Sequence, residues 1–413
     1  MSLGQEGIGV STDLIIIMLL FLFGVDVLDK SGILIALCIL LFLFFNLSKL
    51  EFDFSAGILV LFSAFYFGSV AFYEGLTVDV IIKFAIAPWG CYLMGYTLRL
   101  NNRAISVTYF ALLVAFGFFV HGMLNLYSSI EVFGASFNND YRQAFDFWQN
   151  RTISVTTASL YYTPFTLMSI GLIFWSKRLR FRFMGMVCLA LGLYASMIYQ
   201  NRTLILACGL VMGLNVLLIL LSPDISIENK YKICGLLALL VFAAVIAFLL
   251  NVGGLKDTIM NSSLMNRMSG DKQDRTTIWK SFIFGEAWKY PFGGTKAVLY
   301  HNKPFVHNMW LDCFRRGGFF PFLFLICFTV RSALDVMAFN RLGKLCGEEP
   351  GVLISLLAGM MMSFMVEPVI DANPYVFYCP ILVMGVINGL NRDTQGILDD
   401  TDALLEEYYK MAL

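Results

Sequence analysis

The chain has 413 residues, of which 58% are hydrophobic, 15% are aromatic and only 14% are charged. So little polar surface cannot enclose a single water-soluble core, so the composition excludes a soluble globular protein and predicts an integral membrane protein. The formal net charge is zero, and it says nothing about partners because only the distribution of charge across the membrane is informative.

Apolar runs recur along the chain and approach or reach the roughly 20 residues that a helix needs to span a hydrocarbon core. None alternates polar and apolar residues as a membrane β-strand does. The expected fold class is therefore an all-α polytopic membrane protein with about 12 transmembrane helices. The predicted helices cover residues 12–25, 31–47, 54–73, 77–98, 104–126, 153–175, 183–199, 203–221, 233–252, 317–334, 351–367 and 375–390.

The chain start lacks a basic region and a small-residue cleavage site, so the first apolar run is expected to stay in the protein as a helix. The basic residues of the short loops orient the helices, because cytoplasmic loops are enriched in lysine and arginine. With both termini in the cytoplasm, the short outer loops hold only Lys30, Arg142, Arg151 and Arg202. The remaining loop lysines and arginines then face inside, and the long segment before His307 faces outside.

This topology divides the chain into four parts. Residues 1–252 form nine transmembrane helices with a smaller outer loop at about 127–152. Residues 253–316 form a large outer loop that holds two of the three histidines. Residues 317–390 form three further helices, and residues 391–413 form an acidic cytoplasmic tail. Because the polar groups concentrate in the large outer loop, any chemistry is expected there.

Two short helices are predicted inside the large outer loop. The first is capped by Asp274 and ended by Pro291, and its aromatic-rich face is expected to lie along the membrane surface. Its apolar positions are Ile278, Trp279, Phe282, Ile283 and Trp288. The second starts near His307 and places His307, Leu311 and Arg315 on one face at helical spacing.

A series of short motifs runs from the end of the seventh helix to the start of the tenth. They are, in order, Gln200-Asn201-Arg202-Thr203, Arg275-Thr276-Thr277-Ile278-Trp279, Tyr290-Pro291-Phe292-Gly293-Gly294, His307-Asn308-Met309-Trp310-Leu311 and Gly317-Gly318. In this order, and in its helix count, the chain resembles the O-antigen polymerase and O-antigen ligase superfamily of bacterial surface-polysaccharide enzymes, which are GT-C-like. One departure is Gly293-Gly294-Thr295, where that family more usually has Gly-x-Gly.

The resemblance implies a membrane glycosyltransferase, independent of metal and cofactor. It would polymerise undecaprenyl-diphosphate-linked repeat units of an O-antigen, capsule or exopolysaccharide at the periplasmic face of the inner membrane. Its partners would be the lipid-linked glycan donor, a glycan acceptor and a chain-length regulator, with no nucleic acid. The alternatives are a ligase that transfers the polysaccharide to lipid A core and, from another class, a transporter or flippase of lipid-linked glycan. Transporters place polar groups near the bilayer midplane in broken helices, unlike this chain.

Arginines on the outer side suit a diphosphate, because the guanidinium is permanently charged and binds phosphate oxygens in pairs. The resemblance makes Arg202 and Arg275 catalytic residues that hold the departing diphosphate. Three further arginines, Arg267, Arg142 and Arg151, are candidates for substrate binding. The alternative for each is an interfacial side chain that reaches lipid phosphates.

His307 is the candidate general base, since a neutral imidazole can accept a proton from a hydroxyl near neutral pH. The His-Asn match to the family supports it, with Asn308 as a substrate-binding residue. His301 is the rival, because it also precedes an asparagine but is not followed by an apolar helix. The third histidine, His121, is expected to be buried and hydrogen-bonded.

Two pairs of ionisable residues near the outer ends of helices complete the candidate set. Lys83 stands four residues after Asp79 in an apolar helix, so the two form a structural pair or line the lipid-phosphate cavity. Glu367 and Asp371 flank Pro368, where a carboxylate caps a helix end, orients His307 or binds the acceptor. No glycine-rich phosphate loop and no acidic metal cluster occurs in the outer loop, so no metal site is expected.

Overall fold

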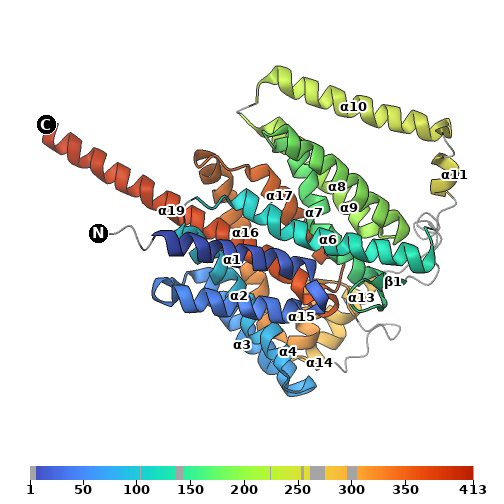
Figure 1. The fold of residues 1–413 in the computed structure, drawn as a ribbon, viewed down its shortest axis with the longest axis horizontal. Coiled ribbons are helices and arrows are strands. Elements are labelled where there is room, and N and C mark those ends of the chain that lie inside the picture. Colours follow the sequence, from blue (N-terminus) through green and yellow to red (C-terminus); the bar gives the residue numbers. More distant parts are fainter. Residues whose placement is uncertain are drawn as a thin grey trace.

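The computed structural model describes residues 6–102, 104–135, 143–223, 225–252, 255–260, 275–294 and 305–412. Within these ranges the chain is a bundle of helices with one small β-hairpin (Figure 1). The N-terminal helix begins, and the C-terminal helix ends, at the same end of the bundle. The hairpin and the short helices of the large outer loop gather at the opposite end.

Every predicted helical range falls on an observed helix. The long helices are α1 (Glu6–Val25), α2 (Ser31–Asn46), α3 (Phe54–Glu74), α5 (Ala87–Asn101), α6 (Val107–Phe133), α7 (Val155–Trp175), α8 (Leu179–Ile198), α9 (Arg202–Leu221), α10 (Ile227–Leu249), α16 (Phe319–Leu345), α17 (Pro350–Phe364) and α19 (Pro374–Ala412). The short elements are η1 (Val27–Asp29), η2 (Leu47–Lys49), α4 (Val78–Val80), η3 (Ile81–Ile86), α11 (Leu255–Met260), α13 (Arg275–Ser281), η5 (Phe282–Glu286), α14 (Ala287–Lys289), α15 (Met309–Gly317) and α18 (Val369–Ala372).

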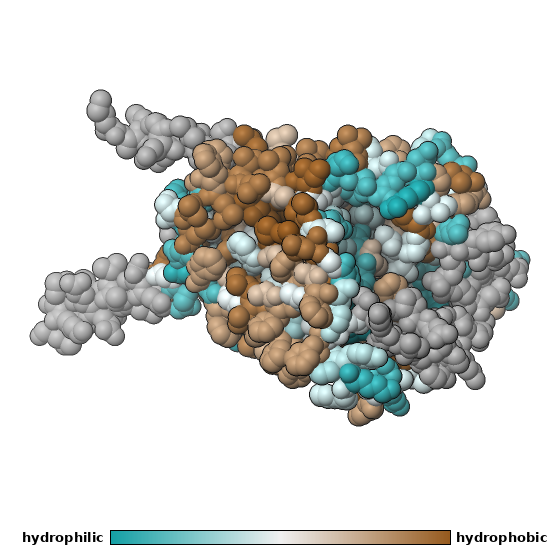
Figure 2. Space-filling view, turned by 90° about the horizontal axis from the view of Figure 1, so that it is seen from below, coloured by the Kyte–Doolittle hydropathy of each residue, from teal (hydrophilic) through white to brown (hydrophobic). Residues whose placement is uncertain are grey.

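Eight of the described helices are long and apolar enough to cross a membrane. Their outward faces carry large apolar side chains, such as Leu40 and Phe44 on α2 and Val330 and Met337 on α16. Figure 2 shows hydrophobic residues gathered over a broad part of one face of the molecule, with hydrophilic residues beside them. Exposed apolar surface of this extent is unusual for a protein in water and suits contact with lipid. The count of about twelve crossings stays a prediction.

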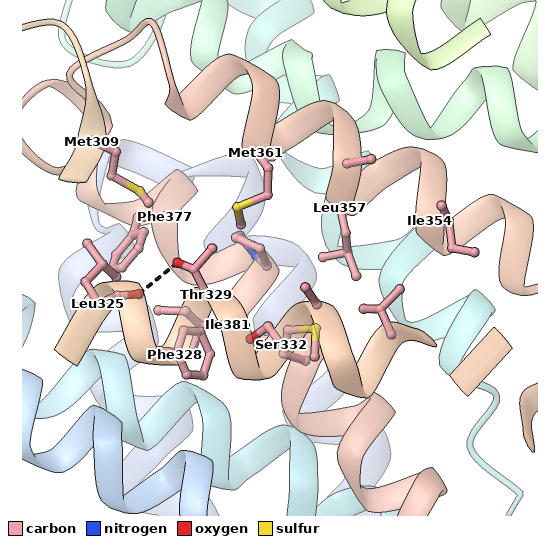
Figure 3. A pocket seen from close by; sticks show the side chains of 15 residues that line it. Met309, Leu325, Phe328, Thr329, Ser332, Ile354, Leu357, Met361, Phe377 and Ile381 are labelled. Carbon is pink, nitrogen blue, oxygen red and sulfur yellow. Dashed lines mark hydrogen bonds between the residues drawn. The ribbon is translucent and has the colours of Figure 1, made fainter. Parts of the chain in front are cut away.

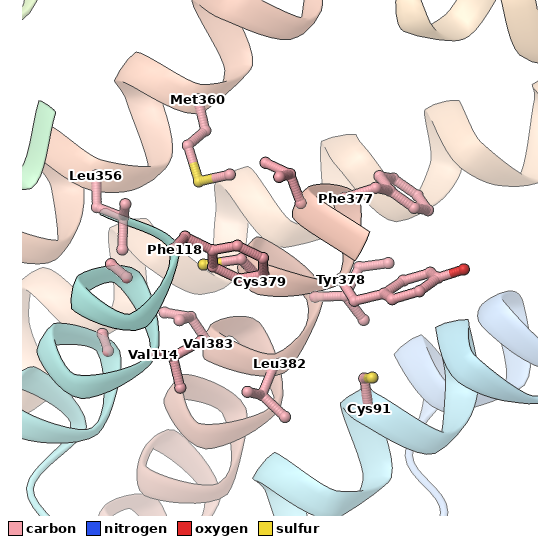
Figure 4. Close-up of a cluster of buried hydrophobic side chains, with 14 of the residues drawn as sticks. Cys91, Val114, Phe118, Leu356, Met360, Phe377, Tyr378, Cys379, Leu382 and Val383 are labelled. Carbon is pink, nitrogen blue, oxygen red and sulfur yellow. The ribbon is translucent and has the colours of Figure 1, made fainter. Parts of the chain in front are cut away.

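The core of the bundle is built around α19, which packs closely on α5. Glycine makes this approach possible, because a Cβ on Gly385 would lie 2.1 Å from the carbonyl oxygen of Tyr92. Small residues allow helix backbones to approach in this way in membrane bundles. Figure 4 shows the apolar side chains of α5, α6, α17 and α19 that fill the space between these helices.

The smaller outer loop contains a two-stranded antiparallel hairpin, β1 (Gln143–Asp146) and β2 (Arg151–Ser154), that the sequence did not predict. Helix α6 also runs on to Phe133, beyond the predicted end at residue 126. Ser129 in this extension and Asn125 just before it bond the hairpin: Ser129 Oγ accepts from the backbone N–H of Phe145 at 2.8 Å, and Asn125 Oδ1 accepts from that of Phe147 at 2.9 Å. Because of these long-range hydrogen bonds, part of the segment that was expected to be a loop is a helix end and a hairpin.

His121 is buried in this region, as predicted, but neither ring nitrogen makes the predicted hydrogen bond with a residue that the structure describes. Its ring is 0% exposed and stacks on Tyr161 with 3.9 Å between ring centroids. Nδ1 lies 3.8 Å from a carboxylate oxygen of Asp26, and Nε2 lies 3.6 Å from one of Asp146. The histidine therefore lies between two carboxylates, that of Asp26 just after α1 and that of Asp146 at the end of β1.

Candidate functional site

The first predicted helix of the large outer loop is present. Elements α13, η5 and α14 follow one another from Arg275 to Lys289, and the helical run ends before Pro291. The predicted cap, Asp274, lies outside the described residues. Ile278 and Phe282 are buried against α15, where the ring of Phe282 meets that of Phe314 edge to face at 5.8 Å. Packing of this apolar face on α15 fixes where Arg275 lies.

The turn after this helix depends on its two glycines. Gly293 and Gly294 adopt φ values of 85° and 133°, which side chains disfavour. A Cβ on Gly293 would lie 2.4 Å from the carbonyl oxygen of Arg316, and the backbone N–H of Gly294 donates to the carbonyl of Arg315 at 3.1 Å. The turn is thereby fastened to the end of α15, so the double glycine serves close backbone approach.

The second predicted helix, α15, begins at Met309 rather than at His307. Asn308 is its N-cap, with the side-chain oxygen accepting from the backbone of Leu311 at 3.1 Å. His307 precedes the cap with φ 59°, so it does not share a helical face with Leu311 and Arg315 as predicted. The reason is the cap: Asn308 accepts the free N–H of Leu311 in the first turn of the helix, which leaves His307 outside the helix.

The Asn308 amide also donates from Nδ2 to the carbonyl of Met365 at 3.1 Å, just after the end of α17. Since the side chain is 8% exposed, its oxygen and nitrogen are used in the protein, and its role here is to hold the His307 turn against α17. The imidazole of His307 itself is half-buried, next to Phe305 with 6.2 Å between ring centroids.

Arg202 and Arg275 line one polar cleft, although they come from distant parts of the sequence. Arg202 is the first residue of α9, and Arg275 the first of α13. Between them stands Glu367, just beyond α17. Its Oε1 accepts a hydrogen bond from the Thr203 hydroxyl at 2.8 Å and lies 4.0 Å from Nη2 of Arg275. The side chain of Arg275 is 32% exposed, so the site is reachable from outside.

Several predicted site residues lie elsewhere or are not described. Lys83 pairs with Asp79 at 2.7 Å and lies over the ring of Tyr375 at 5.2 Å, which confirms the predicted pair; it does not line the cleft with Arg275. Arg151 is exposed on β2, where it is opposite Asp146. The remaining candidates, Arg142, Arg267 and His301, lie outside the described residues.

A group of ion pairs behind the cleft was not predicted from the sequence. Asp371 accepts from Arg315 at 2.7 Å and from Arg316 at 2.9 Å, and Arg316 also binds Glu74 at the end of α3. Asp371 therefore joins α15 and α18, and it does not line the cleft with Arg202 and Arg275. The pKa of Asp312 on α15 is raised to about 7, mainly because the carboxyl group is buried and also because the charge of Asp371 lies nearby.

An apolar groove leads from this region toward the middle of the bundle. It runs between α16, α17 and α19, holds about 240 Å³ of space, and has Met309 near one end (Figure 3). Leu325, Leu357 and Met361 are among its apolar walls. Met361 lies one helical turn before Met365, whose carbonyl accepts a hydrogen bond from Asn308. The groove therefore reaches the contact between the end of α17 and the start of α15.

No family model matches this chain, and no curated protein matches it significantly. Among the residues that the structure describes, no group of three or more histidine, cysteine, aspartate or glutamate side chains is placed to hold a metal ion.

Proposed function

We propose that the protein is a membrane glycosyltransferase that joins undecaprenyl-diphosphate-linked oligosaccharide repeat units at the periplasmic face of the bacterial inner membrane. The observation that carries the proposal is the meeting of Arg202 and Arg275 in one cleft at the end of the bundle. Two guanidinium groups from separate helices are a natural receptor for a diphosphate, because each forms paired, charge-assisted hydrogen bonds with phosphate oxygens.

His307 supplies the base in this proposal. It takes the proton from an acceptor sugar hydroxyl while that oxygen forms a bond to the anomeric carbon of the donor. The bond from this carbon to the diphosphate oxygen breaks, and both electrons leave with the undecaprenyl diphosphate. Arg202 and Arg275 stabilise the negative charge that develops on this leaving group.

The apolar groove supports a donor that is anchored in the membrane. Its walls carry almost no polar groups apart from the hydroxyls of Thr329 and Ser332, and the Thr329 hydroxyl already donates to the carbonyl of Leu325 at 2.8 Å. Such a groove suits an isoprenoid chain, since every buried methylene contributes about 0.8 kcal/mol of hydrophobic stabilisation.

The N-terminal helix begins and the C-terminal helix ends at the same end of the bundle (Figure 1), which agrees with two cytoplasmic termini.

The test is a transfer assay with the purified protein in lipid nanodiscs and synthetic lipid-linked repeat units. His307→Ala should remove most of the glycan transfer, about 100- to 10,000-fold, while the donor still binds because both cleft arginines remain. His301→Ala should stay within a few-fold of the parent. The assay runs with matched protein amounts and with EDTA.

The acceptor decides between the two chemistries of the superfamily. Elongation of lipid-linked repeat units supports the polymerase, whereas transfer only to lipid A core oligosaccharide replaces it with the ligase. Movement of lipid-linked glycan across vesicles without any transfer product replaces both with a flippase. Full activity of both histidine variants contradicts the general-base mechanism.

A further inference from the structure

Asp312 binds the backbone on both sides of His307. Its Oδ1 accepts a hydrogen bond from the N–H of Val306 at 2.8 Å, and its Oδ2 accepts one from the N–H of Asn308 at 3.1 Å. The residue is 1% exposed. A single carboxylate that spans two peptide groups fixes the path of the residue between them, which is His307.

The backbone of His307 needs this support. Its φ of 59° lies in the left-handed region, which is uncommon for residues other than glycine. Such a conformation is unfavourable and persists only where the surroundings hold it. Without the carboxylate, the turn would relax and the imidazole would point in another direction.

Other contacts hold the same turn from outside α15. The indole N–H of Trp279 donates to the carbonyl of Val306 at 3.0 Å, so both polar groups of the Val306 backbone are bonded. Trp279 stands one helical turn after Arg275 on α13. The position of the histidine is thus tied to the helix that carries one of the cleft arginines.

Asp312 is itself held in place by charge. Nε of Arg315 lies 3.5 Å from Oδ1 of Asp312, and the same guanidinium is anchored to Asp371 at 2.7 Å. Two peptide N–H groups and a guanidinium around one buried carboxylate offset part of its desolvation. This arrangement demands a carboxylate, because an amide has only one acceptor oxygen.

We propose that Asp312 is a positioning residue of the transfer reaction, which orients the His307 imidazole toward the acceptor hydroxyl without touching the substrate. This inference rests on the proposed function, because Asp312 can affect the transfer rate only if His307 is the base that it orients. The nine-residue helix α15 then serves to hold the His307 turn against α13 and the end of α17.

The experiment compares Asp312→Asn with the parent protein in the nanodisc transfer assay at pH 8. Asparagine leaves one of the two peptide N–H groups facing an amide NH₂ instead of an acceptor. We expect kcat to fall about 10- to 100-fold, the loss typical of a misplaced catalytic group, and KM for the donor to stay within about 2-fold because Arg202 and Arg275 are untouched.

The matched control is Asp335→Asn, which removes another buried carboxylate, bonded to Asn388 at 2.8 Å on a part of α16 away from the site. Its kcat and KM should stay near the parental values. If Asp312→Asn does not give folded protein, Trp279→Phe removes the bond on the other side of Val306 and should lower kcat in the same way, by a smaller factor.

A double variant distinguishes positioning from general stability. In a His307→Ala background, Asp312→Asn should cause no further loss of the residual transfer, because the residue acts through the imidazole. An equal further loss there overturns the proposal, as does a raised donor KM with unchanged kcat in the single variant. Parental transfer by His307→Ala alone is a different failure: it removes the base from the proposed function, and the role of Asp312 with it.

Discussion

Glu367 is the negative charge inside a cleft that we propose for a diphosphate, and its removal should strengthen binding. Glu367→Gln keeps an oxygen that can accept the hydrogen bond from Thr203, now 2.8 Å long, but loses the charge 4.0 Å from Arg275. Two unit charges at about 4 Å interact by about 4 kcal/mol at an effective dielectric constant near 20.

Solvent reduces this value. The side chain of Arg275 is 32% exposed and that of Glu367 10%, and partly exposed pairs are screened to about 1 kcal/mol. A diphosphate must replace the Glu367 carboxylate as the partner of Arg275. Removing the charge of this carboxylate should therefore tighten diphosphate binding by about 5- to 10-fold, since a tenfold change in affinity corresponds to about 1.4 kcal/mol.

The measurement is the affinity of the purified protein in nanodiscs for undecaprenyl diphosphate, at low and at high salt. The gain should shrink with added salt, because the interaction is partly exposed to solvent. Glu74→Gln is the matched control, since Glu74 pairs with Arg316 at 2.6 Å and does not line the cleft. Unchanged or weaker binding by Glu367→Gln, with the control unaffected, would refute the reasoning that this carboxylate opposes the ligand.

Three further predictions address the arginines, the ion pairs and the topology. Arg202→Lys and Arg275→Lys should each lose about 2–4 kcal/mol of transition-state stabilisation in the transfer assay, because lysine cannot form paired bonds; near-normal turnover at equal protein amount contradicts this. Asp371→Asn should lower the melting temperature in detergent, because it removes the negative charge shared by the buried Arg315 and the partly buried Arg316, a loss of about 3 kcal/mol; an unchanged melting temperature counts against it. In a cysteine-free background, an impermeant thiol reagent applied to intact cells should label Thr276→Cys but not Arg180→Cys; labelling of the latter reverses the orientation.

The helices could be predicted because their signals are local. Each apolar run is long enough to form a helix by itself, and the turn residues that end it are adjacent in the sequence. Pro291 ends the helical run from Arg275, and Asn308 caps α15. The extension of α6 and the β-hairpin could not be predicted in this way, because Ser129 acquires its partner only when residue 145 folds back onto it.

The candidate site divides in the same manner. Residue chemistry and motif order singled out Arg202, Arg275, His307 and Glu367 one at a time. Nothing in the order of residues indicates that Glu367 stands 4.0 Å from Arg275, or that Asp371 binds Arg315 and Arg316. The signal that was missed is the charge pattern of α15, with an aspartate and two arginines on a short helix that is otherwise apolar.

The helical membrane class and the positions of the helices follow from the amino-acid sequence alone, because apolar length and capping residues act over a few neighbouring positions. Tertiary packing, in contrast, sets which polar groups meet at the end of the bundle and gives His307 its left-handed backbone. That conformation is unfavourable locally. It exists because Asp312 and Trp279 bind the peptide groups beside the histidine, and Trp279 comes into range only when α13 packs on α15.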